Sequence, residues 1–592
     1  MSQQRLRPSQ IITTFGPGSI VDLPDDSVMI AGIEHWFEAY KPHKKISEPR
    51  LQAALRVIEF RTPPVGAYSG KDIPFVRFPR WRVCPKCSRL SNDFRFPKKG
   101  DLELPPVPRC DRCNCETYPA RLVVACAKGH IDDFPWYRWL HRGQNCGGGN
   151  LYLRGEGKSA ALGDLRIECS CGIQSRTLSG ALSRDAMREC GVRCRRHRPW
   201  LNDEEDPDDC TSSKTPLYVL QRGASNVYFS VVRSALSIPP WSDPLQAEVA
   251  SWWGQFQGRL PAEAWAAVIQ ARFPDQPEEK VRQCIRRLDG LQSEKPSIRR
   301  EEYEVFNADV DHVSPPYFEA RRQEISADTA TFVSRLVAVS RLREVRALLG
   351  FTRIEAPEMD PTIEVFNEEQ GVSVSPAPLS ARELNWLPAV ENLGEGVFLR
   401  LNPERLVVWE GREDVLRRAG VLLKAYSEWR QKRGLQALKE QRPRLLLLHT
   451  LGHLLIRQMS LDCGYSSASL RERVYSDSEM AGLLIYTSAP DSDGSLGGLV
   501  RQARLSRNPD GTVRDNFARL LADVVELARI CSSDPLCREH DPKRTERLNG
   551  AACHACAMVS ETSCEFGNRL LDRGMIAGLP NSPGTGYFDF DE

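Results

Sequence analysis

The chain has 592 residues, of which 41% are hydrophobic and 27% are charged, and its formal net charge is +2. This composition excludes a disordered chain, and the length exceeds what one hydrophobic core supports, so about three or four structural units are expected. The near-neutral charge excludes a strongly basic protein, so any contact with nucleic acid must come from a local patch.

The sequence carries no recognisable targeting segment. Its beginning, MSQQRLRPSQIITTFGPGSIVDL, lacks the apolar stretch of a signal peptide. The longest aliphatic run, LLLLH at 445–449, is far shorter than the roughly 20 residues that span a bilayer. We therefore expect a cytoplasmic protein, whose thiols stay reduced, and interpret most of its 19 cysteines as metal-binding residues.

The N-terminal region, residues 1–215, is predicted to be rich in zinc ribbons. It is rich in cysteine, proline and glycine, and short strand-like runs occur at 55–60 and 164–169. An acidic, turn-rich stretch at 202–216 predicts a linker. The apolar run that follows, at 217–238, predicts buried strands.

A central region, 216–435, is predicted to continue from strands into mostly helical structure. Apolar residues recur with a helical period at Leu245, Val249, Trp252 and Phe256, and a similar stripe predicts a helix over 331–351. The runs 396–401 and 405–410 predict a short hairpin.

The C-terminal domain, 436–592, is predicted to be α/β with a cysteine cluster. Its apolar patterns predict helices over 444–459 and 513–530 and a strand over 482–489. The whole chain is therefore predicted to be a multidomain α+β protein.

Two cysteine pairs predict a structural zinc site. Cys84, Cys87, Cys110 and Cys113 form the pattern C-x2-C-x22-C-x2-C, and two such pairs complete a tetrahedral shell of thiolates. A redox-active pair is the alternative, but it would need a single C-x-x-C that opens a helix beside a strand. Cys115 is then a spare thiol.

A looser set of candidate ligands follows. Four cysteines in the pattern C-x-C…C-x3-C predict a second four-sulfur site: Cys169, Cys171, Cys190 and Cys194. Three earlier residues, with His141 as a fourth candidate, predict a third ion, although a buried thiol beside a loop histidine explains them equally well: Cys126, His130 and Cys146. Cys210 and Cys284 have no partner at metal-binding spacing and are expected to be packing residues.

The C-terminal region offers five cysteines for at most four positions on one ion: Cys531, Cys537, Cys553, Cys556 and Cys564. The last three are the strongest candidates, and Cys537 or Cys531 supplies the fourth ligand. The sequence thus predicts two or more zinc ions per chain.

Two motifs resemble those of enzymes but lack a required residue. Gly157-Lys158-Ser159 matches the end of a phosphate-binding loop, but Tyr152 stands where the first glycine belongs. In HTLGH, His449 and His453 have the spacing of a zinc protease, but Thr450 replaces the catalytic glutamate. We therefore predict no catalytic or cofactor-binding residues other than metal ligands, and interpret the two histidines as packed helix residues.

A basic stretch, CGVRCRRHRPW at 190–200, is the best local candidate for contact with DNA. Cations beside an aromatic ring suit a phosphate backbone with unstacked bases, although a solvated basic face explains the stretch equally well. The candidate residues are Arg193, Arg195, Arg196, Arg198 and Trp200.

Five blocks together resemble the DrmB family of the DISARM anti-phage system: RPSQIITTFGPGSIVDL at 7–23, GHIDDFPW at 129–136, RGASNVYF at 222–229, HTLGHLLI at 449–456 and CHACAMVSETSCEFGNRLLDR at 553–573. From about residue 440 onward, the chain also resembles a cysteine-rich domain that accompanies superfamily 2 DNA helicases. The resemblance implies a non-catalytic partner that docks on the helicase DrmA and helps to form its DNA path.

Two functions of different classes remain. The leading one is a zinc-stabilised subunit that docks on a DNA translocase and contacts the backbone of DNA, either single-stranded or at an end. A purely structural scaffold differs from it only in making no DNA contact. The alternative is a metal-dependent nuclease or other hydrolase in the C-terminal domain, with ligands among Asp462, His449, His453 and Asp491. The hydrolase would require a cleft with an open metal position, and the sequence offers no tight carboxylate cluster.

Overall fold

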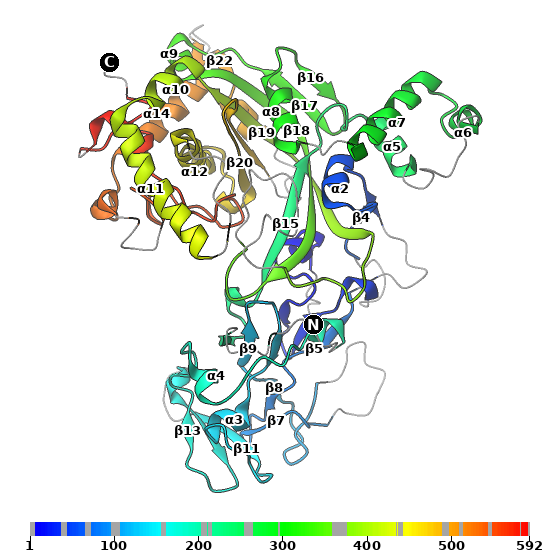
Figure 1. Cartoon of the computed structure of the whole chain (residues 1–592), viewed down its shortest axis with the longest axis vertical. Coiled ribbons are helices and arrows are strands. Elements are labelled where there is room, and N and C mark those ends of the chain that lie inside the picture. Colours follow the sequence, from blue (N-terminus) through cyan, green and yellow to red (C-terminus); the bar gives the residue numbers. More distant parts are fainter. Residues whose placement is uncertain are drawn as a thin grey trace.

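The computed structural model describes residues 6–36, 44–64, 73–95, 107–155, 161–202, 210, 216–253, 264–293, 297–357, 376–433, 435, 442–487, 497–507, 513–540, 542, 548–580 and 582–589. These residues form the multidomain α+β fold expected from the sequence (Figure 1).

A pair of long antiparallel strands runs through the middle of the molecule. β18 (Val333–Thr352) pairs with β19 (Trp386–Leu401) from Val333 to Ala347, and this pair carries the other strands of a nine-stranded sheet. In Figure 1, β15 and β18 connect the upper part of the molecule to the cysteine-rich lower part. The pair therefore forms the spine of the fold.

Shorter strands from distant parts of the sequence add to both edges of the spine. Along β18 lie β17 (Phe318–Arg322) and then β15 (Phe229–Leu236), and along β19 lie β21 (Ala481–Thr487) and, in parallel, β4 (Glu59–Arg61). The sheet is completed by β16 (His312–Ser314), β20 (Leu470–Ser476) and β3 (Lys45–Ile46). Segments from all three predicted regions thus share one sheet, and the boundaries at 215/216 and 435/436 stay predictions.

The prediction of a helix over 331–351 is wrong, because this segment is β18. Leu336 and Ala338 face the core beneath the C-terminal helices, whereas Val337 and Val339 face the core beneath the central helices. A strand that is buried on both faces reads as a nearly continuous apolar run, which fits a helical period as well as an alternating one.

The prediction of a hairpin over 396–401 and 405–410 is also wrong. The first run belongs to β19, and the second lies in helix α10 (Pro403–Glu410). The Asn402 side chain accepts hydrogen bonds from the backbone N–H groups of Glu404, at 3.0 Å, and Arg405, at 3.3 Å. An asparagine cap followed by a proline in the first turn starts a helix despite the β-branched residues that follow.

The central helices pack on one face of the sheet. The helix predicted from the stripe at Leu245, Val249 and Trp252 is α5 (Pro244–Trp253), whereas Phe256 lies outside the described residues. It packs with α6 (Trp265–Arg272), α7 (Glu278–Ser293) and α8 (Ile298–Asn307). Because the central region also contains the longest strands, its description as mostly helical holds only loosely.

The C-terminal helices cover the other face. α12 (Pro443–Cys463) is the predicted helix over 444–459, and it packs against β20, β21 and α14 (Asn516–Arg529). The leucines of the LLLL run are fully buried, since a helix that is apolar all round lies inside a core. The remaining elements of this part are α9 (Ala327–Ala330), α11 (Glu413–Lys432), α13 (Gly498–Gln502), β22 (Leu505–Arg507) and β23 (Val513–Asp515).

The cysteine-rich part is built on two small sheets. One has the order β10-β9-β14, with β9 (Leu122–Cys126), β10 (Ile131–Asp133) and β14 (Leu217–Gln221). The other has the order β13-β12-β11-β7-β6-β8, with β6 (Arg82–Val83), β7 (Arg89–Ser91), β8 (Tyr118–Pro119), β11 (Leu151–Gly155), β12 (Leu165–Cys169) and β13 (Arg176–Thr177). Short elements complete this end: α1 (Pro8–Thr13), α3 (Trp136–Leu140), α4 (Ala186–Glu189), β1 (Ile20–Asp22), β2 (Ser27–Ile30) and β5 (Phe75–Arg77). In contrast, α2 (Pro49–Leu55) lies beside β15 and the central helix α7 (Figure 1).

The last residues of the spine contact the cysteine-rich part directly. Phe351 makes an edge-to-face contact with Trp200, with ring centroids 5.1 Å apart. The buried Arg353 donates from Nε to the carbonyl oxygen of Gly129 at 2.8 Å. Within the described residues, no helix combines the length and apolarity needed to cross a membrane.

Candidate zinc centres

Four clusters in the described part of the chain each contain at least three cysteines, and within each cluster the four ligand atoms lie within 4.8 Å of one another. The first cluster is Cys84, Cys87, Cys110 and Cys113; the second is Cys126, His130, Cys194 and Cys210; the third is His141, Cys146, Cys169 and Cys171; the fourth is Cys531, Cys537, Cys553 and Cys556.

The spacing of the sulfur atoms fits tetrahedral zinc. Thiolates bound at about 2.3 Å to a tetrahedral ion lie about 3.8 Å apart. One Sγ–Sγ pair from each cluster illustrates the fit, at 3.8, 3.8, 3.6 and 3.9 Å respectively: Cys87 with Cys110, Cys126 with Cys194, Cys146 with Cys169, and Cys537 with Cys556.

The first cluster brings together the four residues predicted from the paired C-x2-C pattern. The residue after each pair has a left-handed backbone conformation: Ser88 has φ 60° and Asn114 has φ 49°. Their N–H groups donate to the carbonyl oxygens of Cys84, at 2.9 Å, and Cys110, at 2.8 Å, so both turns close in the same way. Cys115 is not remote from the cluster, because its Sγ lies 3.4 Å from that of Cys84.

The pKa of Cys84 is lowered to about 6. Burial opposes ionisation of this thiol, but backbone N–H groups of the turn and the neighbouring thiols stabilise the thiolate more strongly. A thiolate is the form that binds zinc, so the fold prepares this ligand before the ion arrives.

The four-sulfur site predicted from Cys169, Cys171, Cys190 and Cys194 is wrong, because the structure divides these residues. Cys194 joins the second cluster, Cys169 and Cys171 join the third, and Cys190 belongs to neither. The Cys190 side chain is buried in the core of this region, 3.7 Å from the guanidinium of Arg176. Spacing along the chain misleads here, because neighbouring cysteines in the sequence point into different clusters and each cluster also takes ligands from distant segments.

The second cluster forms where β9 turns into β10. The antiparallel register places Cys126 opposite His130, and Cys126 Sγ lies 3.3 Å from His130 Nδ1. Cys210 completes the cluster, with its Sγ 3.6 Å from that of Cys126. The expectation that Cys210 is a packing residue is therefore wrong, and its separation of 84 residues from Cys126 explains why spacing could not reveal it. Cys284 does lie in an apolar core, as expected.

The third cluster combines the end of α3 with the β11–β12 hairpin. His141 Nδ1 is bonded to the carbonyl oxygen of Tyr137 at 2.9 Å, so its Nε2 lone pair faces Cys171 Sγ at 3.3 Å. Such a bond fixes the tautomer of a metal-binding histidine. At Gly149, a Cβ atom would lie 2.4 Å from Cys169 Sγ, so only glycine leaves room for this sulfur. His141 thus lies in a different cluster from Cys126 and His130.

The fourth cluster contains both Cys531 and Cys537 and excludes Cys564, so the prediction that Cys564 is among the strongest ligands of this set is wrong. Cys564 Sγ lies instead 3.2 Å from His449 Nε2. The buried Arg573 donates from Nη2 to Cys537 Sγ at 3.1 Å. Burial opposes its charge, but the nearby cysteines raise its pKa, so it stays protonated and offsets the net charge of −2 that four thiolates leave on Zn²⁺.

The basic stretch at 190–200 is only partly available to a ligand. Arg193 and Arg195 are exposed, and Arg195 forms an ion pair with Asp132 at 2.6 Å. Trp200 is fully buried, and its indole N–H donates to Pro378 at 2.9 Å. The prediction that Trp200 stacks on a base is therefore wrong for this fold, whereas the arginines stay a prediction.

Of the hydrolase candidates that the structure describes, His449 and His453 lie together, but Asp462 does not join them. Asp462 accepts hydrogen bonds from Gln458 and Arg519, each at 3.0 Å, whereas His449 and His453 are fully buried. Asp491 and the candidate phosphate-binding segment Gly157-Lys158-Ser159 lie outside the described residues.

Two families match parts of the chain. Residues 451–557 match the MrfA Zn-binding domain, and this range contains the whole fourth cluster. Residues 7–229 match a domain of unknown function, DUF8724, which contains the first three clusters. Zinc is therefore the metal of this chain, and its clusters suit several ions.

One relative matches the chain from end to end. The DISARM protein DrmB of Bacillus paralicheniformis is 34% identical to it over 593 residues, which cover 96% of this chain and 99% of the relative. The chain therefore belongs to the DrmB family of DISARM proteins.

Proposed function

We propose that this chain is a non-catalytic, zinc-stabilised subunit of a cytoplasmic DISARM anti-phage complex, where it docks on the helicase DrmA and helps to bind DNA. Membership of the DrmB family supports a role in the defence complex. The observation that supports a non-catalytic role is that the protein fills every position of the four zinc centres. Each cluster supplies four protein ligands, as in structural zinc sites, whereas catalytic zinc keeps a position open for water or substrate.

A docking surface for the helicase fits beside the fourth cluster. Leu461 at the end of α12 is 77% exposed and Ile530 after α14 is 76% exposed. Together with Leu527 they line a hollow of about 400 Å³ that reaches Cys531 and Cys556. Exposed apolar patches of this kind mark protein interfaces, and a zinc site beneath the patch holds its loops in place.

The test is binding of the purified helicase subunit to the full chain. We expect Leu461→Asp to weaken this binding at least tenfold, because a charge would be buried in an apolar contact. Val407→Asp is the matched control, since Val407 is 67% exposed on α10, away from the hollow. Equal binding by the Leu461→Asp variant and the wild type, with unchanged zinc content, would refute this docking surface.

A further inference from the structure

We propose that a further zinc ion is held by His449, His453, Glu472 and Cys564, outside the four cysteine-rich clusters. The ligand atoms of these residues also lie within 4.8 Å of one another. The matched zinc-binding domain, 451–557, leaves out both His449 and Cys564, so it does not account for this site. The proposal rests on the geometry of this cluster and not on the proposed docking or DNA binding.

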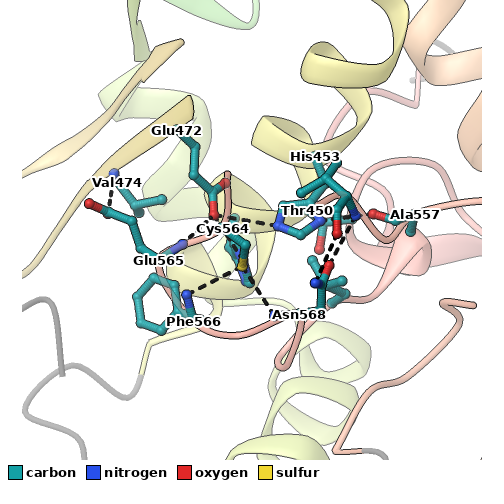
Figure 2. Close-up of polar contacts among 12 residues, drawn as sticks. Thr450, His453, Glu472, Val474, Ala557, Cys564, Glu565, Phe566 and Asn568 are labelled. Carbon is teal, nitrogen blue, oxygen red and sulfur yellow. Dashed lines mark hydrogen bonds and ion pairs between the residues drawn. The ribbon is translucent and has the colours of Figure 1, made fainter. Parts of the chain in front are cut away.

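Three separate elements deliver the four side chains. α12 presents His449 and His453 one turn apart on the same face, β20 supplies Glu472, and the loop after the fourth cluster supplies Cys564. Figure 2 shows His453, Glu472 and Cys564 directed toward one another between helix, strand and loop. A shared ion would therefore fasten the C-terminal loop to the centre of its domain.

The distances between ligand atoms suit a tetrahedral ion. Glu472 Oε1 lies 3.1 Å from His449 Nε2 and 3.4 Å from His453 Nε2, and Cys564 Sγ lies 3.2 Å from His449 Nε2. Ligands at ordinary zinc distances would be about 3.3 to 3.6 Å apart, so the ion needs only a small expansion of the cluster.

The surroundings orient each ligand toward the centre. His453 Nδ1 is bonded to the carbonyl oxygen of Ala557 at 2.8 Å, which leaves the lone pair of Nε2 facing inward. This buried Nε2 has no hydrogen-bond partner of normal geometry in the part of the chain that is described. Cys564 Sγ accepts backbone N–H groups from Phe566 at 3.3 Å and Asn568 at 3.1 Å, as thiolate ligands in zinc turns do (Figure 2).

Glycine at position 452 makes room for the carboxylate. A Cβ atom there would lie 2.5 Å from Glu472 Oε2. The backbone N–H of Glu565 donates to Glu472 Oε1 at 3.2 Å and holds it in place (Figure 2). The HTLGH sequence therefore provides two ligands and the space for a third, which comes from a strand 19 residues beyond His453.

Charge and burial make this site structural. Zn²⁺ with one carboxylate, one thiolate and two neutral imidazoles has no net charge, so a buried position costs little. His449, His453 and Glu472 are at most 1% exposed, and all four positions are taken by the protein. No position is left for a catalytic water, which separates this site from the protease motif that it resembles.

The test is the number of zinc ions on the intact chain, measured by native mass spectrometry and elemental analysis. The proposal expects one ion more than the four cysteine-rich clusters supply, and Cys564→Ala should lose that one ion. Cys463→Ala is the matched control, because Cys463 ends the same helix and bonds to Gln502 outside every cluster. Cys564→Asp, which keeps an anionic ligand, should retain the ion.

Two results would overturn the proposal. One is a wild-type chain with only four ions, and the other is a Cys564→Ala variant with the same count as the wild type. If Cys564→Ala does not fold, the number of zinc ions on the wild type and on the Cys564→Asp variant still tests the proposal. Cobalt substitution adds a second readout. Loss of the Cys564 thiolate should remove the part of the sulfur-to-cobalt charge-transfer absorbance that one Co–S bond contributes. None of these results depends on helicase or DNA binding.

Discussion

Arg573 is the buried cation that contacts the fourth cluster. It is 1% exposed, and its guanidinium contacts Cys537 Sγ. We expect Arg573→Met to destabilise the C-terminal part by about 3 kcal/mol, since the buried thiolates lose their counter-charge. The measurements are the melting temperature of the full chain and the rate of zinc release to a chelator. Arg569→Met, which removes a half-buried arginine over Trp429, should change both far less. Equal behaviour of the two variants would contradict this role.

Metal ligands that lie close together in the sequence could be predicted, whereas those that lie far apart could not. The pairs at Cys84 and Cys110 are local turns, so their spacing reveals them. Cys210 lies far along the chain from the rest of its cluster, and Glu472 reaches the histidines only because β20 packs against α12, so spacing gives no sign of either. The blocks GHIDDFPW and HTLGHLLI did carry a signal: they hold His130 in the second cluster, and His449 and His453 in the histidine-rich one.

At the scale of elements, the loop that carries Cys194 is the candidate contact with DNA. We expect the double variant Arg193→Glu/Arg195→Glu to weaken DNA binding by the helicase complex and to reduce the slope of log K against log salt by about 2, because each phosphate contact releases about one counterion. Arg282→Glu/Arg286→Glu is the control, because these arginines lie on α7, far from the loop, and make ion pairs of the same kind as that of Arg195 with Asp132 (Figure 1). An unchanged slope for the loop variant would identify the loop as a solvated surface.

The elements themselves were predictable where one face is buried and the other is not. α5 and α14 follow from their apolar stripes for this reason. β18 does not, because both of its faces are buried and its 20 residues are typical of a helix. For α10, the cap formed by Asn402 and Pro403 was the better signal than the β-branched residues after it. β18 forms a strand because it packs between α12 and the central helices. The local sequence does not reveal this packing.

For the whole molecule, zinc removal should destabilise both the cysteine-rich part and the C-terminal part. A four-ligand site does not exist in the unfolded chain, so the binding energy of each ion is folding energy. We expect a strong chelator to lower the melting temperature and to increase proteolysis both within 84–210 and within 531–564. A chelator saturated with zinc beforehand is the control. An unchanged melting curve after proven loss of the metal would show that the clusters do not support the fold.

The spine, β18 paired with β19, sets the distance between the cysteine-rich part and the C-terminal part of the molecule. β18 begins at Val333, after Phe332, whose carbonyl oxygen accepts a hydrogen bond from Tyr587 of the C-terminal segment at 2.9 Å. It ends at Thr352, after Phe351, which packs against Trp200. Twenty residues of strand extend roughly 66 Å at about 3.3 Å per residue. If a protein binds at one end and a nucleic acid at the other, as proposed above, this pair of hydrogen-bonded strands would set the distance between them. On that proposal the molecule would act as a spacer, and a motor bound at one end would move DNA past a reference point at the other.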